Sequence, residues 1–528
     1  MRSILESSIL YQSKVVTHHE LVISLKHCFI SDLIAVPDFG AGAMENWGLI
    51  TYRETSLLFS EGQSSSKAQE WVAIVVAHEL AHQWFGNLVT MQWWNDLWLN
   101  EGFASWMEYK GVNQIKPDWS MMEQFWTAKL LPALQLDSLA SSHPVSVPVK
   151  DPKEIEAIFD TISYKKGSSI IYMLEGYMGQ DDLRSGLEKY LSQHKFENAV
   201  TKDLWSCLSS ASKQKIDVES MMNTWTLQMG YPLITFSKIE GGKGWSIEQS
   251  RFLALVNLNG SDLSQPPSKY NYSWSVPVNF KTDKNDVHHV FLQHNSNNSN
   301  INMKKMPDNI KWIKANLNGT GYYRVMYPED IWKGLTAQLK DDHLALSAVD
   351  RAQLLDDAFS LMKAGHLSET IPLEMSTYLT KEKSLVVWRT AIHHLASLSE
   401  LLRETDARDD ISNYIRGLLQ PIYDDLGWED KGTHVQRLLR EDVLKAAAEA
   451  DHKEALTKAK ALFIALKKND SSVPANLRSL VYSVGIRTGD EVDWSWCYEK
   501  YISTNIPSER SILLSALGDS NNVLVLQR

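Results

Sequence analysis

The feature that most constrains this chain is a pair of histidines four residues apart, His78 and His82, with Glu79 directly after the first. We expect residues 64–87 to form a helix, on which residues four apart lie on the same face. The two imidazoles can then point at one shared ion, and neutral imidazole is a preferred ligand of zinc. Glu79 supplies the carboxylate that a zinc-activated water needs as its proton acceptor.

A catalytic zinc usually has three protein ligands and a water, so a third ligand is required. Glu101 fits, because it follows a Trp-rich run and opens an amphipathic segment, residues 102–109. We expect residues 96–113 to form a second helix, which carries Glu101. The alternative interpretation is a helix that carries two structural histidines, and an acid in this position weakens it. The pattern therefore predicts a zinc hydrolase site with one Zn²⁺ per chain.

Length and charge limit the class of protein. A chain of 528 residues is too long for one core, so three or more domains are expected. The net charge is -11, from 53 basic and 64 acidic side chains, and no basic cluster is interleaved with aromatic residues. Nucleic acid is therefore excluded as a partner. An acidic protein suits a cationic substrate such as a peptide with a free amino terminus.

Cysteine use and glycosylation motifs bear on the compartment. The three cysteines, Cys28, Cys207 and Cys497, form at most one disulfide and have no metal-type spacing. Sequons for N-glycosylation occur at Asn259, Asn271, Asn297, Asn318 and Asn469. They favour a secretory compartment, although a chain rich in Asn and Ser produces some by chance.

Neither a membrane span nor a signal peptide is expected. The most apolar early run, residues 21–36, is interrupted by Lys26, His27 and Asp32 and is too polar to cross a bilayer. Residues 1–13 lack a basic start followed by an apolar core.

The spacing of apolar residues changes twice along the chain, and the secondary structure that it predicts changes with it. Residues 1–229 are mostly helical and contain the metal motif, with an atypical beginning. Residues 230–327 contain short β-prone runs separated by turns, which indicates a small β-sandwich. Residues 328–528 contain repeated helix pairs, which indicates an incomplete α-solenoid of the HEAT or armadillo kind. The fold class expected is multidomain α+β.

A glycine-rich segment precedes the metal motif. Small residues up to Glu45 allow a peptide backbone to approach closely, and residues 49–52 predict a strand at a sheet edge. Such an edge beside a zinc site can hold an extended substrate by main-chain hydrogen bonds. Read alone, the segment is more often an ordinary turn, and Glu45 a solvated loop acid.

Taken together, the motifs resemble the gluzincin zinc aminopeptidases, the family that includes the membrane alanyl, leucyl-cystinyl, endoplasmic-reticulum and glutamyl aminopeptidases. The matching segments are residues 42–46, 78–82, 98–104 and 162–167, and the resemblance extends from about Leu33 to the C-terminus. The glutamyl branch looks nearest.

This resemblance implies a thermolysin-like catalytic domain and a role for each matching residue. His78, His82 and Glu101 would bind zinc, Glu79 would be the general base, and Tyr164 would donate a hydrogen bond to the oxyanion. Substrate-binding residues implied by the family are Gly42, Ala43, Met44, Glu45 and Asn46, with Glu45 holding the free ammonium group. Without the family, Tyr164 reads as a packed helical tyrosine.

The chain also departs from the family pattern. Residues 1–30 do not resemble the large β-rich domain that should precede residue 42, and the C-terminal helical region looks incomplete. Ala41 stands where glutamyl-type members tend to carry Thr, so a preference for acidic side chains is not carried over.

Three functional hypotheses follow. The first is a zinc aminopeptidase that removes the first residue of peptides, with a homodimer as a further expectation. Its parent form would be a plasma-membrane ectodomain or a protein of the secretory pathway, anchored only through a segment absent from this chain. The alternative is a truncated, impaired member that acts as a binding partner or decoy, because the missing domain would leave apolar surface uncovered. An endopeptidase is a third interpretation, and Glu45 argues against it.

Overall fold

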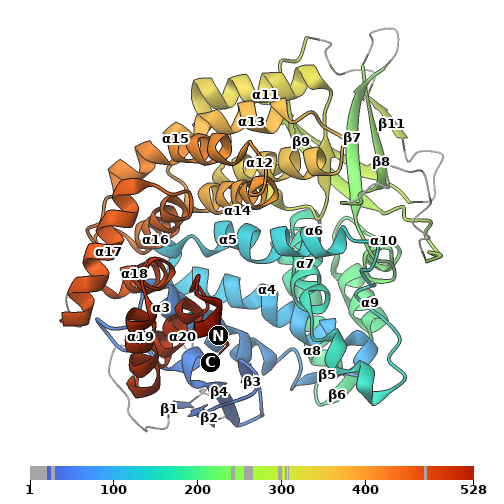
Figure 1. The fold of residues 1–528 in the computed structure, drawn as a ribbon. Coiled ribbons are helices and arrows are strands. Elements are labelled where there is room, and N and C mark those ends of the chain that lie inside the picture. The colour runs from blue at the N-terminus through green and yellow to red at the C-terminus, as the bar shows by residue number, and fades with distance from the viewer. Residues whose placement is uncertain are drawn as a thin grey trace. The chain divides into compact units, whose positions relative to one another are not determined.

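The computed structural model describes residues 21–24, 30–239, 244–254, 266–294, 300–303, 306, 309–468 and 473–527 (Figure 1). Over these residues the chain is mostly helical, with small sheets and a helical region after residue 328, as the coarse fold class predicted. It divides into two compact units. The first comprises residues 1–80, 108–121 and 379–528, and the second comprises residues 81–107 and 122–378.

The first unit contains a four-stranded sheet in the order β1-β2-β4-β3. Its strands are β1 (Leu21–Ser24), β2 (Ile30–Val36), β3 (Ala43–Met44) and β4 (Leu49–Arg53). The predicted strand is present as β4, but the expectation that it forms the sheet edge is wrong. β4 pairs with β2 on one side and with β3 on the other, because the chain turns at Gly48 (φ 93°) and folds β3 back against it.

Helices make up the rest of the first unit. They are α2 (Glu54–Leu57), most of α3 (Ser66–His82), the second half of α4 (Trp98–Ile115), α14 (Leu385–Leu402), α15 (Arg408–Leu426), α16 (His434–Glu449), α17 (Lys453–Lys468), α18 (Ala475–Thr488), α19 (Glu491–Ser503), α20 (Pro507–Leu517) and α21 (Val523–Leu526). Figure 1 shows α16 to α20 in orange to red. The sequence pattern predicts helical runs at residues 385–403, 410–426, 434–450 and 453–468. These runs match α14, α15, α16 and α17 within two residues.

Helix α3 is shorter than the predicted range of 64–87. It stops at His82 because Gly86 adopts a φ of 135°, and the Gly86 N–H bonds to the carbonyl of Val89 in the following turn. Both α3 and α4 pass from one unit into the other without a break.

The second unit holds the remaining helices. They are the first half of α4, α5 (Met121–Phe125), α6 (Leu131–Asp137), α7 (Gly167–Met178), α8 (Gln180–Gln193), α9 (Thr201–Ala211), α10 (Val218–Thr226), α11 (Glu329–Asp342), α12 (Ala348–Lys363) and α13 (Thr370–Ser376), with π-turns η3 (Trp126–Leu130) and η6 (Ile162–Lys166). The sequence pattern of residues 153–160 predicts a helix, and this prediction is wrong. Only 3-10 turns form there, because Phe159 leaves the helical region with a ψ of 67°.

Three sheets complete the second unit. Their strand orders are β10-β9-β12, β11-β8-β7-β13 and β5-β6. The strands are β5 (Val89–Met91), β6 (Glu197–Ala199), β7 (Pro232–Lys238), β8 (Trp245–Arg251), β9 (Val276–Thr282), β10 (Val287–Leu292), β11 (Asn300–Met303), β12 (Ile313–Ala315) and β13 (Arg324–Met326). Figure 1 shows β7, β8 and β11 side by side.

The structure bears on the expectations about the cysteines, the glycosylation sequons and a membrane span. Cys207 and Cys497 are buried free thiols, whereas Cys28 lies outside the described residues, as do the sequons at Asn259, Asn297 and Asn469. Asn271 and Asn318 are exposed. In the part of the chain that the structure describes, no helix combines the length and apolarity that a membrane crossing requires.

A buried ion cluster joins a sheet of the second unit to α12. The Arg324 guanidinium on β13 lies 2.7 Å from the Asp356 carboxylate and 3.1 Å from that of Asp357, and all three side chains are almost fully buried. Burial raises the pKa of Asp357 to about 7 even though Arg324 opposes the shift.

We expect Arg324→Met to destabilise the second unit by about 3–5 kcal/mol, because it leaves two buried carboxylates without their cation. The measurement is the urea midpoint of unfolding. Arg184→Met, which breaks an exposed pair with Asp181, is the matched control and should change stability by less than about 0.5 kcal/mol. Equal midpoints for the two variants would contradict the expectation.

Candidate metal centre

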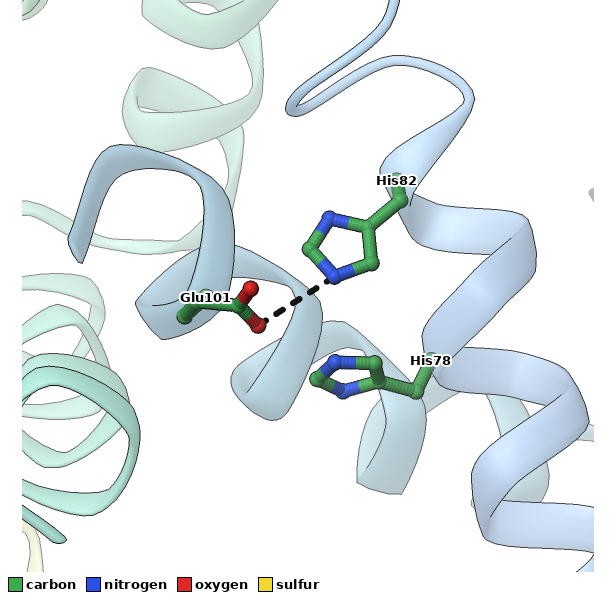
Figure 2. A group of neighbouring side chains, drawn as sticks. All are labelled: His78, His82 and Glu101. Atoms are coloured by element: carbon green, nitrogen blue, oxygen red, sulfur yellow. Dashed lines mark ion pairs between the residues drawn. The ribbon is translucent and has the colours of Figure 1, made fainter. Parts of the chain in front are cut away.

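The two histidines of α3 and the predicted acid of α4 come together. His78 and His82 project from successive turns of α3 toward Glu101 (Figure 2). One ligand atom of each residue lies within 4.8 Å of the others, and His82 Nε2 is 3.3 Å from Glu101 Oε2. His82 and Glu101 are buried, and the His78 side chain is 13% exposed.

Hydrogen bonds on the far side of each ring fix which nitrogen faces this point. His78 Nδ1 lies 2.6 Å from the Glu108 carboxylate, and His82 Nδ1 lies 2.9 Å from the carbonyl oxygen of Phe85. Both partners are acceptors, so each Nδ1 carries a proton and donates it. In the neutral rings, each Nε2 then presents a lone pair, as in metal sites whose histidines are oriented by a second layer of acceptors.

This donor set fits a metal ion. In the neutral ring, the Nε2 lone pair of His82 faces a carboxylate oxygen, and two electron pairs at that distance are stabilised by a cation between them. Two imidazole nitrogens and one carboxylate are a ligand set that zinc takes in hydrolases.

The turn after α3 holds His82 in place. The rings of Phe85 and Phe103 stack with centroids 4.6 Å apart, which fixes the Phe85 carbonyl that accepts from His82. A Cβ added at Gly86 would lie 3.2 Å from His82 Nδ1, and its φ of 135° favours glycine. A side chain at this position would therefore press on the imidazole.

The start of α4 is anchored to α9. The buried Asp96 carboxylate accepts hydrogen bonds from the backbone N–H and the hydroxyl of Thr201, at 3.2 and 2.8 Å. Trp98 Nε1 donates to the same hydroxyl at 3.0 Å. These bonds hold the first turn of α4, which carries Glu101.

The predicted base and the predicted amine-binding acid are neighbours. Glu79 is 4% exposed, and a carboxylate oxygen of Glu45 lies within 4.8 Å of one of Glu79. Burial raises the pKa of Tyr52, and the nearby Glu79 carboxylate raises it further. Two adjacent carboxylates form a negative site that suits a cationic group.

Three other residues of the Gly-Ala-Met-Glu-Asn segment, Gly42, Met44 and Asn46, are exposed. Ala43 and Met44 form the edge strand β3, and Gly42 accepts a backbone hydrogen bond from Arg53 at 2.9 Å. Asn46 donates from its side-chain amide to Thr51 Oγ1 at 3.1 Å, so this side chain braces the turn before β4.

Tyr164 lies on the π-turn η6, where the sequence predicted a regular helix. The segment is close to Glu101 through a glycine contact, because a Cβ on Gly102 would lie 3.1 Å from the carbonyl carbon of Gly167 and 3.5 Å from the carbonyl oxygen of Ser163. The two helices approach closely only because both positions are glycine. π-turns are frequent at functional sites.

Sequence reasoning missed Glu108. It follows Glu101 by seven residues on the same helix, so it lies two turns away on the same face. That spacing was a usable signal. No sequence signal pointed to the Phe85 carbonyl, because the position of a backbone acceptor is fixed by the turn and not by residue type.

The fold and the site together define a class. A mostly helical chain with His-Glu-x-x-His on one helix and a glutamate on the next has the arrangement of metallopeptidases. Residues 12–225 match the family model described as peptidase family M1 domain, and residues 312–528 match the ERAP1-like C-terminal domain. These two matches confirm the family resemblance that the sequence motifs indicated.

Individual relatives agree with this family. The chain is similar to glutamyl aminopeptidase of Homo sapiens, with 42% identity over 94% of this chain and 51% of that protein. It is 43% identical to glutamyl aminopeptidase of Rattus norvegicus over 94% of this chain and 52% of the relative. Endoplasmic reticulum aminopeptidase 1 of Homo sapiens is 36% identical over 94% of this chain and 54% of its own length.

The chain therefore spans about half the length of these relatives. The family match begins at residue 12, earlier than Leu33, whereas these relatives align with 94% of the chain. Residues 12–30 carried no motif that sequence reasoning could use.

We expect Glu108→Gln to weaken zinc binding about 10- to 100-fold, because the amide is a poorer acceptor for the His78 Nδ1 proton. Competition with a zinc chelator measures the change. The control is Glu188→Gln on the exposed face of α8, which removes the same charge and should leave affinity unaltered. Equal affinities for both variants would exclude Glu108 as a support of the metal site.

We expect Gly102→Ala to destabilise the second unit by about 1–3 kcal/mol, because the new methyl group overpacks against the backbone of Gly167. Better helix propensity offsets roughly 0.5–1 kcal/mol of this. Gly417→Ala on α15, where no atom lies within 4 Å of the added Cβ, should be neutral or slightly stabilising. Thermal unfolding of both variants is the measurement, and a stabilised Gly102→Ala would contradict the close-packing interpretation.

Proposed function

We propose that this chain carries the catalytic centre of a zinc-dependent aminopeptidase that removes the N-terminal residue of peptides. The observation that carries the proposal is the convergence of His78, His82 and Glu101, next in sequence to a buried Glu79. The match to the peptidase family M1 domain and the similarity to aminopeptidases support the same activity.

His78, His82 and Glu101 would hold one zinc ion through Nε2, Nε2 and a carboxylate oxygen. Zinc bound by such ligands acts as a Lewis acid and lowers the pKa of a water that it binds. Glu79 directly follows the first ligand, so its carboxylate is placed to accept the proton of the attacking water. Its burial strengthens this interaction by excluding bulk solvent.

Recognition of the peptide terminus is assigned to the segment around β3. Glu45 would pair with the free ammonium group, and its closeness to Glu79 supports a cationic ligand there. The main chain of Gly42, Ala43 and Met44 would hold the substrate backbone along the edge strand, with Asn46 fixing the turn behind it.

Tyr164 would donate its phenolic hydrogen to the oxyanion that forms at the scissile carbonyl. The glycine contact between α4 and α7 supports this, because it brings the segment that carries Tyr164 next to the residue after Glu101. Losing one oxyanion donor typically costs about 2.7–4 kcal/mol of transition-state stabilisation.

The finer architecture is part of the same proposal. We assign residues 1–229 to a thermolysin-like catalytic domain, residues 230–327 to a β-sandwich and residues 328–528 to a HEAT-like or armadillo-like α-solenoid. The sheets β10-β9-β12 and β11-β8-β7-β13 support the second domain, and the succession of helices from α11 to α21 supports the third.

We further propose that the protein is extracellular or in the secretory pathway and forms a homodimer. The exposed sequons at Asn271 and Asn318 and the name of the endoplasmic reticulum relative support the compartment. The comparisons do not favour the alternative of an impaired binding partner or decoy.

We expect the zinc-loaded chain to cleave aminoacyl reporters that have a free amine. Glu79→Gln should lower kcat by at least about 100-fold while zinc content stays unchanged, because the base is lost and the ligands are not. Turnover and metal content measured on the same samples test this. Zinc binding without turnover in the unmodified chain would support the decoy, and equal cleavage of acetylated peptides would indicate an endopeptidase.

A further inference from the structure

The π-turn that carries Tyr164 is capped by the side chain of Asp160. One oxygen of this carboxylate, Oδ1, accepts hydrogen bonds from the backbone N–H groups of Ile162 and Ser163, each at 3.0 Å. The Asp160 carbonyl accepts from the N–H of Tyr164 itself at 3.1 Å. The position of Asp160 therefore sets the position of the Tyr164 backbone.

His143 holds the other oxygen of Asp160. Its Nε2 lies 2.7 Å from Asp160 Oδ2, and its Nδ1 lies 2.7 Å from the carbonyl oxygen of Pro144. Both partners accept hydrogen bonds, so both ring nitrogens donate, and the ring that satisfies both contacts is the imidazolium. The His143 side chain is 30% exposed, so protons from solvent reach it.

Two charged groups act on this imidazole. Burial by itself lowers the pKa of His143, but the hydrogen bond and the charge of Asp160 outweigh burial, so the net pKa is raised above its ordinary value. The Pro144 carbonyl contributes in the same direction, and Lys166 opposes it. A raised pKa means that the ion pair is complete at acidic pH and is lost as pH rises through that pKa.

A second ion pair anchors the other end of the turn. Lys166, fully buried, lies 2.7 Å from Asp137 and donates to the carbonyl of Gly230 at 3.0 Å. Asp137 also accepts from the N–H of Gly230 at 2.8 Å. Tyr164 thus lies between a buried ion pair at Lys166 and a partly exposed ion pair at His143. Burial lowers the pKa of Lys166, and Asp137 opposes that shift.

We propose that His143 is a positioning residue, which in its protonated form holds Asp160 against the π-turn and so keeps Tyr164 in place for the reaction. The inference rests on the proposed function, because it acts through the oxyanion donor assigned there. Deprotonation of His143 removes one of the two supports of the turn, and kcat should fall with it on the alkaline side of the pH profile.

The test compares His143→Gln and Tyr164→Phe, singly and together, in the zinc-loaded full chain. His143→Gln should lower kcat roughly 10- to 100-fold at neutral pH with KM nearly unchanged, since small misplacements of a catalytic group cost this much. This variant should also remove one step on the alkaline side of the profile of kcat against pH. In the Tyr164→Phe background, His143→Gln should cost less than about twofold, because the two residues act as one unit. His289→Gln on the exposed part of β10 is the control and should leave kcat unaltered.

A second variant and a spectroscopic readout separate positioning from folding. Asp160→Asn keeps the Oδ1 acceptor of the cap and removes the charge, so the alkaline step should move to lower pH. The ring protons of His143, followed by NMR, should titrate above the value of a free histidine in the unmodified chain and lower in Asp160→Asn. This measurement does not depend on turnover.

The outcomes are distinct. No turnover in the unmodified zinc-loaded chain would overturn the proposed function and this inference together. Turnover with an unchanged kcat profile in His143→Gln, or full additivity with Tyr164→Phe, would overturn the inference alone. A His143 that titrates at or below the ordinary histidine value would overturn it as well, including in a preparation where His143→Gln fails to fold.

Discussion

The candidate metal site depends on the direction in which two lone pairs point, those on Nε2 of His78 and of His82. His78 and His82 aim Nε2 at a common point because Nδ1 of each ring already donates, to Glu108 and to the Phe85 carbonyl. An imidazole that is free to rotate or to change tautomer would lose much of its affinity for a metal. Much of the nearby packing serves this orientation, including the stacked rings of Phe85 and Phe103 and the unsubstituted Gly86.

A second constraint is the closeness of α4 and α7. The Gly102–Gly167 contact places the helix of the third candidate ligand directly against the helix that follows the π-turn. Polar contacts then hold both ends of the π-turn η6. The Asp160 carboxylate accepts backbone hydrogen bonds at one end, and Lys166 forms a buried ion pair at the other. The backbone around Tyr164, the oxyanion donor proposed above, is therefore held by backbone contact and ion pairs.

The sequence predicted what depends on local spacing. A four-residue interval on a helix fixes the relation of His78 and His82 whatever the rest of the chain does, and the acid that opens the next helix was equally readable. Contacts between residues that lie far apart in the sequence could not be predicted in this way. His143 and Asp160 are 17 residues apart across an irregular loop, and no periodicity relates them. The edge position of β3 depended on a glycine turn whose direction the residue types do not specify.

The most direct test of the account is zinc K-edge X-ray absorption on the purified, zinc-loaded chain and on His82→Ala. The account predicts one zinc per chain with two imidazole nitrogens near 2.0–2.1 Å and otherwise oxygen ligands, and one imidazole fewer in the variant. No bound zinc, sulfur ligands, or an identical spectrum for His82→Ala would contradict it.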